Sequence, residues 1–575
     1  MKKLLLLNCL LVSCVVFAQL PVTVFEQSQG KKTAVYDEII DWWKKADKTS
    51  DKVSIRAMGL TDAGLPLHLV TVSKDGVSDY RQIKKDKRLV ILINNGIHPG
   101  EPDGIDASML LAADIAKGKL NLPQQVVLAI IPVYNIGGCL NRSDNYRVDQ
   151  NGPEVFGFRG NAQNLDLNRD FIKADSKEAF AFAQIFHLTD PDILIDNHVS
   201  NGADYQHVMT LLTSQHDKLG GAMGKYLNEV MEPALYSSME KKGYDLVPYV
   251  NFDHRDKVEK GWDAFWDAPR YSSGYAALWN TFAFVPETHM LKPYSQRVQS
   301  TYELMKSFIE FAGAEQHQIR ELRARAKEEV IKKDSFTVGW QLDKTRSKTI
   351  TFKGYESGYK PSEVSGMPRL YYDRTKLYTR QVPFYNNYQS TVVVNKPKAY
   401  IIPQGWWKVV ERLKANNVAM QRISNDTIIK VQVYRIEDYK TSQRPYEGHH
   451  PNSEVRLGIA SRTVPFRKGD WYVPMNQTAN RFLIETLEPV AEDSYFKWNF
   501  FDAILQQKEG YSDYHFEDIA ADYLKSNREL QQKLEARRRQ DTAFAQSAGA
   551  QLNFIYQNSP WIEPAYLTYP VYRVP

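Results

Sequence analysis

Cysteine is scarce in this chain, which has three cysteines among 575 residues, and two of them, Cys9 and Cys14, lie in the apolar N-terminal stretch. Removal of that stretch leaves Cys139 alone, so we expect no intrachain disulfide. No later run reaches about 18 consecutive apolar residues, so we expect no transmembrane segment. Dense basic runs with interleaved aromatic residues are also missing, and the formal net charge is only +5. We therefore expect no nucleic-acid partner.

The size and composition of the chain are those of a globular protein with more than one domain. Apolar residues make up 43% of the sequence and charged residues 25%, which is ordinary for such proteins. A chain of 575 residues is too long for a single hydrophobic core, so we expect two or three domains. We find no internal repeat and no long low-complexity linker.

The first 18 residues have the pattern of a secretory signal peptide. Two lysines follow the initial methionine, a short apolar stretch comes next, and Ala18 precedes Gln19 at a typical cleavage position. We therefore expect an exported protein, periplasmic or secreted. Residues 11–14 also resemble a lipobox, which would make Cys14 a lipidated anchor. We favour the signal peptide because apolar residues 15–17 follow that cysteine.

Strand-like and helix-like segments alternate through the N-terminal half. Helical spacing at 33–43 precedes two alternating segments that predict a hairpin, and short, continuous apolar runs then predict buried strands. The expected strands are 53–60, 65–72, 88–97, 125–133, 193–195 and 282–285, with a helix at about 105–117. This order predicts an α/β fold with a central mixed β-sheet flanked by helices. Functional residues are then expected at strand ends and loops.

The C-terminal half has a different character. A long helical pattern from 299 to about 333 is followed, from about 335 to 495, by short runs rich in aromatic and β-branched residues. Turn residues separate these runs, which predicts a β-rich domain. The stretch from about 496 to 550 becomes helical again, so terminal helices complete this domain.

Two histidines and a glutamate form the most informative motif. His98 and Glu101 are three residues apart and directly follow a predicted buried strand, and His198 lies far along the chain. Two histidines and one glutamate are a recurrent ligand set of catalytic zinc, whose fourth position is kept for water. Pro99 and Gly100 make the turn that directs both side chains to one point. A further glutamate, Glu287, flanks the last predicted strand.

A second motif occupies residues 164–171, where Asn168 stands beside Arg169. An amide donor next to a planar guanidinium is a good receptor for a carboxylate, which arginine binds through two hydrogen bonds. The alternative is a loop arginine paired with Asp166 or Asp170. In company with the zinc motif, we favour the carboxylate receptor.

These motifs resemble, in order and rough spacing, those of the zinc carboxypeptidase family, over about residues 30–310. The resemblance implies that His98, Glu101 and His198 bind one Zn²⁺ per chain and that Glu287 is the general base. It implies also that Asn168 and Arg169 bind the terminal carboxylate of the substrate. We recognise no family in the last 250 residues or so.

The family also uses a loop arginine that polarises the scissile carbonyl and a mobile tyrosine that closes over the substrate. For the arginine, Arg147 is the better candidate and Arg142 the alternative. For the tyrosine, the resemblance points to Tyr271. One residue of the family's motif is missing after it, which leaves Tyr275 as an alternative.

The resemblance implies an exported metallocarboxypeptidase whose partners are peptides with a free C-terminal carboxylate. Zinc lowers the pKa of a bound water from about 15.7 towards 7, and a nearby glutamate takes its proton. We expect a signal peptide at 1–18, a catalytic domain at 19–320, a helical linker at 321–340 and a C-terminal domain at 341–575. The expected catalytic domain thus takes in the whole resemblance.

Two other functions remain open. The first is a zinc amidohydrolase that deacylates N-acyl amino acids, since related deacylases share these motifs. The second is a protein that binds C-termini without cleaving them, which the presence of Glu287 speaks against. The preferred terminal side chain is left open as well. No acidic residue lies between Tyr271 and Glu287, which favours apolar or aromatic side chains, but Asp263 and Asp267 lie just upstream.

Overall fold

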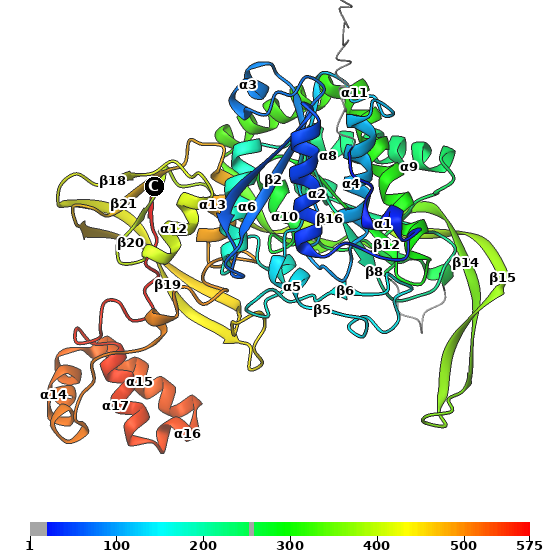
Figure 1. Cartoon of the computed structure of the whole chain (residues 1–575). Coiled ribbons are helices and arrows are strands. Elements are labelled where there is room, and N and C mark those ends of the chain that lie inside the picture. The colour runs from blue at the N-terminus through cyan, green and yellow to red at the C-terminus, as the bar shows by residue number, and fades with distance from the viewer. Residues whose placement is uncertain (1–19, 252–257) are drawn as a thin grey trace, which may run out of the picture. The chain divides into compact units, whose positions relative to one another are not determined.

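The computed structural model describes residues 20–251 and 258–575 (Figure 1). The expected signal peptide, with Cys14, lies outside the described residues. Within them, no helix combines the length and apolar character that crossing a membrane requires. The chain divides into two compact units, residues 1–329 with 340–389 and residues 330–339 with 390–575. The functional domain boundaries named above stay a prediction.

The first unit is built on a mixed nine-stranded sheet. Eight of its strands follow the order β1-β2-β4-β3-β7-β12-β9-β10, and β8 pairs with β12. Strands β4, β3, β7 and β12 form three parallel pairs with one another. The pairs β1–β2, β2–β4 and β12–β9 are antiparallel, and β10 is parallel to β9. The strands are β1 (Val53–Leu60), β2 (Pro66–Val72), β3 (Leu89–Asn94), β4 (Val126–Ile131), β7 (Ile193–Asp196), β8 (His198–Ser200), β9 (Met209–Thr213), β10 (Val247–Pro248) and β12 (Phe282–His289).

Helices cover this sheet, as Figure 1 shows. They are α1 (Val24–Gln27), α2 (Tyr36–Thr49), α3 (Tyr80–Lys85), α4 (Asp103–Ala116), α5 (Ile136–Leu140), α6 (Lys177–Thr189), α7 (His216–Leu219), α8 (Gly221–Tyr226), α9 (Glu232–Lys241), α10 (Ser272–Leu278) and α11 (Tyr294–Lys332). The fold predicted for this region, a central mixed sheet flanked by helices, is confirmed.

The central strands are apolar on both faces because both faces are covered. All six residues of β3 are buried, which is why this segment reads as a continuous apolar run. Leu89, Ile91 and Ile93 join a core with α2, α4 and α11. Val90 and Leu92, also buried, point to the opposite face because side chains alternate along a strand. Helix α6 contacts β1, β2 and β3 outside that first core.

Three short strands and a long hairpin complete the first unit. A ribbon of β14 (Lys348–Pro361) and β15 (Pro368–Tyr385) extends well away from the main sheet (Figure 1). Strand β11 (Trp262–Asp263) pairs with the end of β15, and β5 (Arg142–Ser143) pairs with β6 (Phe156–Gly157).

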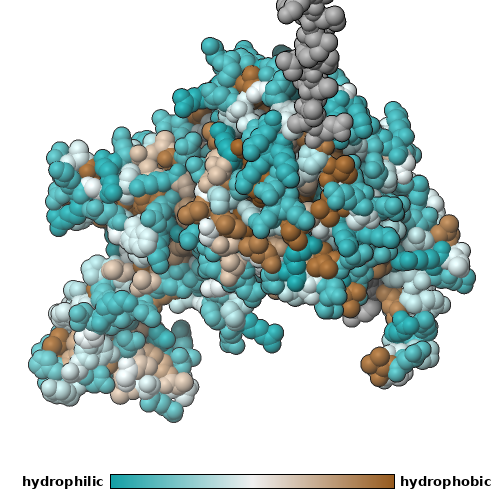
Figure 2. All heavy atoms as spheres, viewed as in Figure 1, coloured by the Kyte–Doolittle hydropathy of each residue, from teal (hydrophilic) through white to brown (hydrophobic). Residues whose placement is uncertain are grey.

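The surface shown in Figure 2 is mainly hydrophilic, with small groups of apolar residues between the hydrophilic ones. Such a mixture is usual for protein surfaces.

The second unit contains a six-stranded sheet of order β18-β21-β17-β22-β19-β20 and several helices. The strands are β17 (Ala399–Ile402), β18 (Gln421–Arg422), β19 (Thr427–Thr441), β20 (Asn452–Phe466), β21 (Trp471–Pro474) and β22 (Tyr572–Val574). The helices are α12 (Trp407–Ala415), α13 (Asn480–Leu487), α14 (Asp513–Ser526), α15 (Arg528–Gln540), α16 (Thr542–Ala545) and α17 (Ala548–Gln557). Strands β13 (Ser335–Leu342) and β16 (Tyr388–Asn395) lie where the chain passes between the units. The predicted β-rich region with terminal helices is confirmed.

Candidate active site

Three buried side chains that we predicted to bind zinc meet at one edge of the main sheet. His98 follows β3, Glu101 precedes α4, and His198 begins β8. One ligand atom from each lies within 4.8 Å of the others. The Nδ1 atoms of His98 and His198 are 3.3 Å and 3.1 Å from the same Oε2 atom of Glu101. Both rings therefore turn the same nitrogen towards one point.

Close packing of two loops brings the ligands together. Asn197, next to His198, donates from Nδ2 to Oδ1 of Asn95 at 2.8 Å, which joins the loop after β7 to the loop after β3. Gly104 lies in the first turn of α4, and a Cβ atom added to it would be 2.4 Å from the Cβ of Asn197. Any larger residue at 104 would push α4, and with it Glu101, away from His198.

Carboxylates hold the other nitrogen of each histidine. Nε2 of His98 lies 2.9 Å from Oδ1 of Asp166, and Nε2 of His198 lies 3.1 Å from Oδ2 of Asp196. Such partners fix the ring orientation and tautomer of a histidine that ligates a metal and increase its basicity. From the sequence we predicted no role for Asp196 and considered Asp166 only as a partner for Arg169.

The charges of this cluster are strongly coupled. Burial alone would lower the pKa of His198, but Asp196 and Glu101 outweigh burial and raise it well above its ordinary value. Burial alone would raise the pKa of Glu101, but His98 and Arg147 outweigh it and hold this pKa well below the ordinary range. The carboxylate is therefore ionised at neutral pH, as a metal ligand must be.

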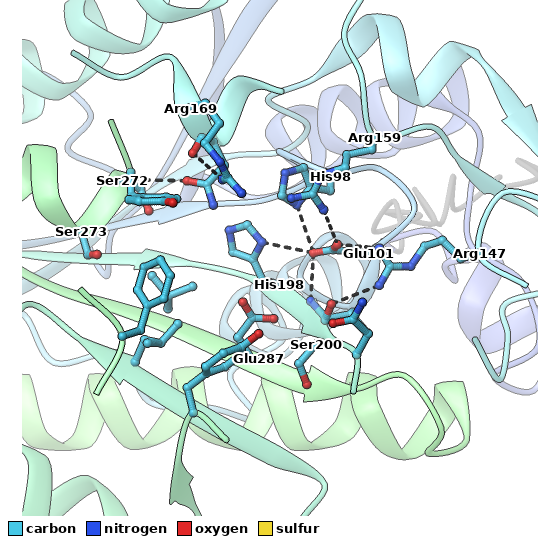
Figure 3. A pocket seen from close by; sticks show the side chains of 18 residues that line it. His98, Glu101, Arg147, Arg159, Arg169, His198, Ser200, Ser272, Ser273 and Glu287 are labelled. Carbon is cyan, nitrogen blue, oxygen red and sulfur yellow. Dashed lines mark hydrogen bonds and ion pairs between the residues drawn. The ribbon is translucent and has the colours of Figure 1, made fainter. Parts of the chain in front are cut away.

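Glu287 lies beside the three-residue cluster. It is in β12, where it is the register partner of His198 in the parallel pair with β8, and Figure 3 shows it close to His198. Burial raises the pKa of Glu287 to about 7; nearby His198 opposes the rise and Glu101 adds to it. A carboxyl that titrates near neutral pH suits proton transfer.

Asn168 and Arg169 both line the pocket that contains His198, and Figure 3 shows Arg169 near Ser272. They belong to a short 3-10 helix, Leu167–Arg169, whose N-cap is Asp166. Oδ1 of Asn168 accepts a hydrogen bond from the backbone of Ser272 at 3.4 Å. The guanidinium of Arg169 stacks over the ring of Tyr271, 4.6 Å from its centre. The expected carboxylate receptor and the expected tyrosine are thus neighbours.

Three arginines are candidates for the residue that polarises the scissile carbonyl. Arg142 donates to the backbone oxygens of Thr33, Ala34 and Val155 and does not line the pocket. Arg147 lines the pocket, but all three of its donor groups are engaged: Nε by Gln150, Nη1 by Glu101 at 2.7 Å and Nη2 by a backbone oxygen. Its Nη1 contact ties this loop to Glu101.

Arg159 also lines the pocket, and we did not predict it from the sequence. Its Nε atom donates to Asp166 at 2.9 Å and its Nη1 atom lies 3.5 Å from Glu101. Within the described part of the chain, its Nη2 atom makes no hydrogen bond, and 45% of its side chain is exposed. Arg159 lies only ten residues before Arg169 and is therefore nearer in sequence to the Asn-Arg pair than Arg147 is. This proximity could have marked Arg159 as a candidate.

One pocket of about 300 Å³ gathers every site residue that we preferred from the sequence. They are His98, Glu101, Arg147, Asn168, Arg169, His198, Tyr271 and Glu287. The alternative tyrosine, Tyr275, does not line it and packs between Phe171, Phe182 and Phe186.

Two histidines outside the pocket, His207 and His289, have structural partners. His207 lies 3.0 Å from the backbone oxygen of Asp245 and accepts from the backbone of Lys353, and His289 bonds to the backbone oxygen of Ala203. Neither lines the pocket that contains Glu287.

Comparisons with solved structures give matches of low overall similarity. The carboxypeptidase A of Helicoverpa armigera is 15% identical, with a TM-score of 0.38 over 52% of this chain and 75% of that chain. A metallo-carboxypeptidase from Burkholderia cenocepacia is 14% identical, with a TM-score of 0.36 over 48% of this chain and 69% of that chain.

Curated proteins and one family model also match this chain. Carboxypeptidase 2 of Trichophyton rubrum is 21% identical over 433 residues, or 71% of this chain and 73% of the relative. The Trichophyton tonsurans protein of the same name is 22% identical over 437 residues, with the same coverage. The family model described as zinc carboxypeptidase matches residues 39–208, which contain all three expected zinc ligands. Residues 39–208 of this chain thus match the zinc carboxypeptidase family, and the chain is similar to curated carboxypeptidases over 71% of its length.

Proposed function

We propose that this protein is an exported zinc metallocarboxypeptidase that removes the last residue of peptides with a free C-terminal carboxylate. One observation carries the proposal: a metal-binding set, a carboxylate with a raised pKa and a carboxylate receptor line the same pocket. These are the three parts that such a reaction needs. The pattern at residues 1–18 supports export.

The donor set at the centre of the pocket fits zinc. His98, Glu101 and His198 would hold one ion per chain, because two imidazole nitrogens and a carboxylate are the usual ligands of catalytic zinc. The ring contacts to Asp166 and Asp196 add the partners that such ligands commonly have. When bound, zinc supplies a water of lowered pKa and withdraws electrons from a carbonyl oxygen.

Glu287 is then the base that takes the proton of the attacking water and passes it to the departing amine. Its position beside His198 and its pKa of about 7 suit both transfers. Arg159 is the better residue to stabilise the oxyanion, because its Nη2 atom makes no hydrogen bond in the described structure, whereas every side-chain nitrogen of Arg147 already donates one. This is a revision of our preference from the sequence.

Asn168 and Arg169 would bind the terminal carboxylate of the peptide and so confine cleavage to the last peptide bond. The stacking of Arg169 on Tyr271 presents the tyrosine to the same part of the pocket. A tyrosine in the pocket wall favours the peptidase over the deacylase among the functions that we considered.

The test is release of free amino acid from blocked dipeptides by the zinc-loaded protein and by Glu287→Gln. We expect release that a chelator abolishes, that added zinc restores, and that Glu287→Gln lowers by orders of magnitude while the variant still holds one zinc per chain. Release that survives chelation would contradict a zinc enzyme. Release from N-acyl amino acids, with none from peptides, would favour the deacylase.

A further inference from the structure

We propose that the pocket selects peptides whose last residue has an uncharged, apolar side chain of about the size of leucine or phenylalanine. The inference rests on the proposed function, because it takes Asn168 and Arg169 as the receptor for the terminal carboxylate. It goes beyond that function by naming the residues that set the preference, Leu212, Tyr249, Phe265 and Val285.

The location of the terminal side chain follows from covalent geometry. The Cα atom that carries this side chain is bonded directly to the terminal carboxylate, so the side chain must lie close to Arg169. Figure 3 places Arg169 and Ser272 on the side of His198 that faces away from Glu101 and Arg147. The walls beside Arg169 therefore decide which terminal residue fits.

Aromatic rings make the first of these walls. Tyr271, which lies under the guanidinium of Arg169, packs edge-to-face against Phe265, with ring centres 5.0 Å apart. Phe265 in turn packs against Tyr249, with ring centres 6.4 Å apart. All three rings line the pocket. They form a continuous apolar surface that begins at the carboxylate receptor.

Two aliphatic side chains make the second wall. Val285 and Leu212 are register partners in the antiparallel pair of β12 and β9, and both line the pocket. Val285 lies two residues before Glu287, so both side chains point to the same face of the sheet. The aliphatic wall therefore stands directly beside the group that we propose as the base.

The two acidic residues that left a basic preference open are engaged elsewhere. Asp267 is buried, and its Oδ1 atom is 2.7 Å from Nζ of Lys218. Asp263 pairs with Lys344 at 3.1 Å. Among the described residues, only Glu101 and Glu287 bring a carboxylate to the pocket. A lysine or arginine side chain against Leu212, Tyr249, Phe265 and Val285 would thus lose hydration, and none of these four side chains carries a charge to offset that cost.

Three residues of the two walls also face a second cavity. Leu212, Tyr249 and Phe265 also line a second, smaller cavity, whose other sides include the polar residues His216 and Asn386. These three side chains therefore lie between the proposed walls and the polar residues of the smaller cavity, which also include Glu232. They are for that reason the positions at which substitution changes the preference.

The first experiment measures kcat/KM of the zinc-loaded protein for blocked dipeptides that differ only in the last residue. We expect leucine, methionine and phenylalanine to exceed lysine, arginine and glutamate by at least tenfold, because burying an apolar side chain contributes enough for such a ratio. An equal or higher value for a charged residue overturns the inference. It leaves the proposed function standing.

The second experiment changes the wall. Leu212→Asp adds a carboxylate, and Leu212→Asn is the matched control with the same shape and no charge. We expect both to lower kcat/KM for terminal leucine, and only Leu212→Asp to raise the value for terminal lysine or arginine relative to leucine, by at least tenfold. The same ratio in both variants would show that Leu212 does not face the terminal side chain.

A binding measurement separates this inference from the proposed function. Zinc-loaded Glu287→Gln is titrated by calorimetry with N-acetyl-leucine, N-acetyl-phenylalanine and N-acetyl-arginine, which carry the terminal carboxylate and side chain. We expect the two apolar ligands to bind at least tenfold more tightly. Tighter or equal binding of N-acetyl-arginine overturns the inference whether or not the wild-type protein hydrolyses peptides.

Discussion

Nε2 of His98 lies 2.9 Å from Oδ1 of Asp166, although 68 residues separate them in the chain. Asp166 is also the N-cap of the short helix that carries Asn168 and Arg169. A single carboxylate thus orients a proposed zinc ligand and begins the segment that we propose to bind the substrate. Asp166 therefore connects the proposed metal site to the proposed carboxylate receptor.

We therefore expect Asp166→Asn to weaken zinc binding by about 10- to 100-fold, the usual effect of removing the partner of a ligating histidine. The measurement is a zinc titration against a competing chelator. Asp149→Asn, on an exposed loop, is the control and should bind zinc like the wild type. Equal affinity in both variants would mean that Asp166 does not support His98.

The two pocket arginines should have separable effects. Removing one donor to an oxyanion typically lowers kcat by about 10²- to 10³-fold, and we expect this from Arg159→Ala with zinc content unchanged. Arg147→Ala removes a partner of Glu101, so we expect weaker zinc binding. The checks are kcat at saturating zinc and zinc affinity for each variant. A large loss of kcat at saturating zinc in Arg147→Ala alone would restore our first preference.

Asp106 should make the protein less stable as the pH rises. Burial raises the pKa of Asp106 to about 7, although a hydrogen bond from Tyr294 opposes the rise. In the unfolded chain this pKa is about 3.9. Between about pH 4 and 7 the folded protein therefore binds a proton that the unfolded chain has released, and the free energy of unfolding falls with pH.

Asp106→Asn removes this dependence because the amide stays neutral. From pH 5 to pH 8 we expect the variant to gain on the wild type by up to about 3 kcal/mol, the value of two pKa units. Thermal unfolding of both proteins across this range is the measurement. The exposed Asp41→Asn should track the wild type, and parallel curves for Asp106→Asn would refute the assignment.

Arg297 and Asp103 form a fully buried ion pair, with Nε of Arg297 3.0 Å from Oδ2 of Asp103. Removing one partner of such a pair usually costs about 3–5 kcal/mol, because the other charge is left buried alone. We expect Arg297→Met to lower the free energy of unfolding by this amount. Adding Asp103→Asn to it should restore part of the loss. A double variant no more stable than Arg297→Met would show that the two charges are not coupled.

Much of the fold of the first unit was predictable because its strands are short, apolar and regularly separated. The continuous run at β3 predicts a strand buried on both faces, and it is one. The ribbon of β14 and β15 was not predicted as part of this unit. Its residues resemble those of any β-rich sequence. Its pairing with β11, more than 80 residues earlier, is a long-range contact that the local sequence does not indicate.

The sequence by itself determined which residues we predict to carry the chemistry, because the spacing of His98 and Glu101 and the Asn168-Arg169 pair are local patterns with few other uses. Only the tertiary structure decided that Arg159 lies beside Glu101, that Asp267 pairs with Lys218, and that Leu212 lies beside Val285. Those choices depend on which distant side chain neutralises or contacts another. Sequence spacing does not encode such contacts, whereas the packing of strands and loops does.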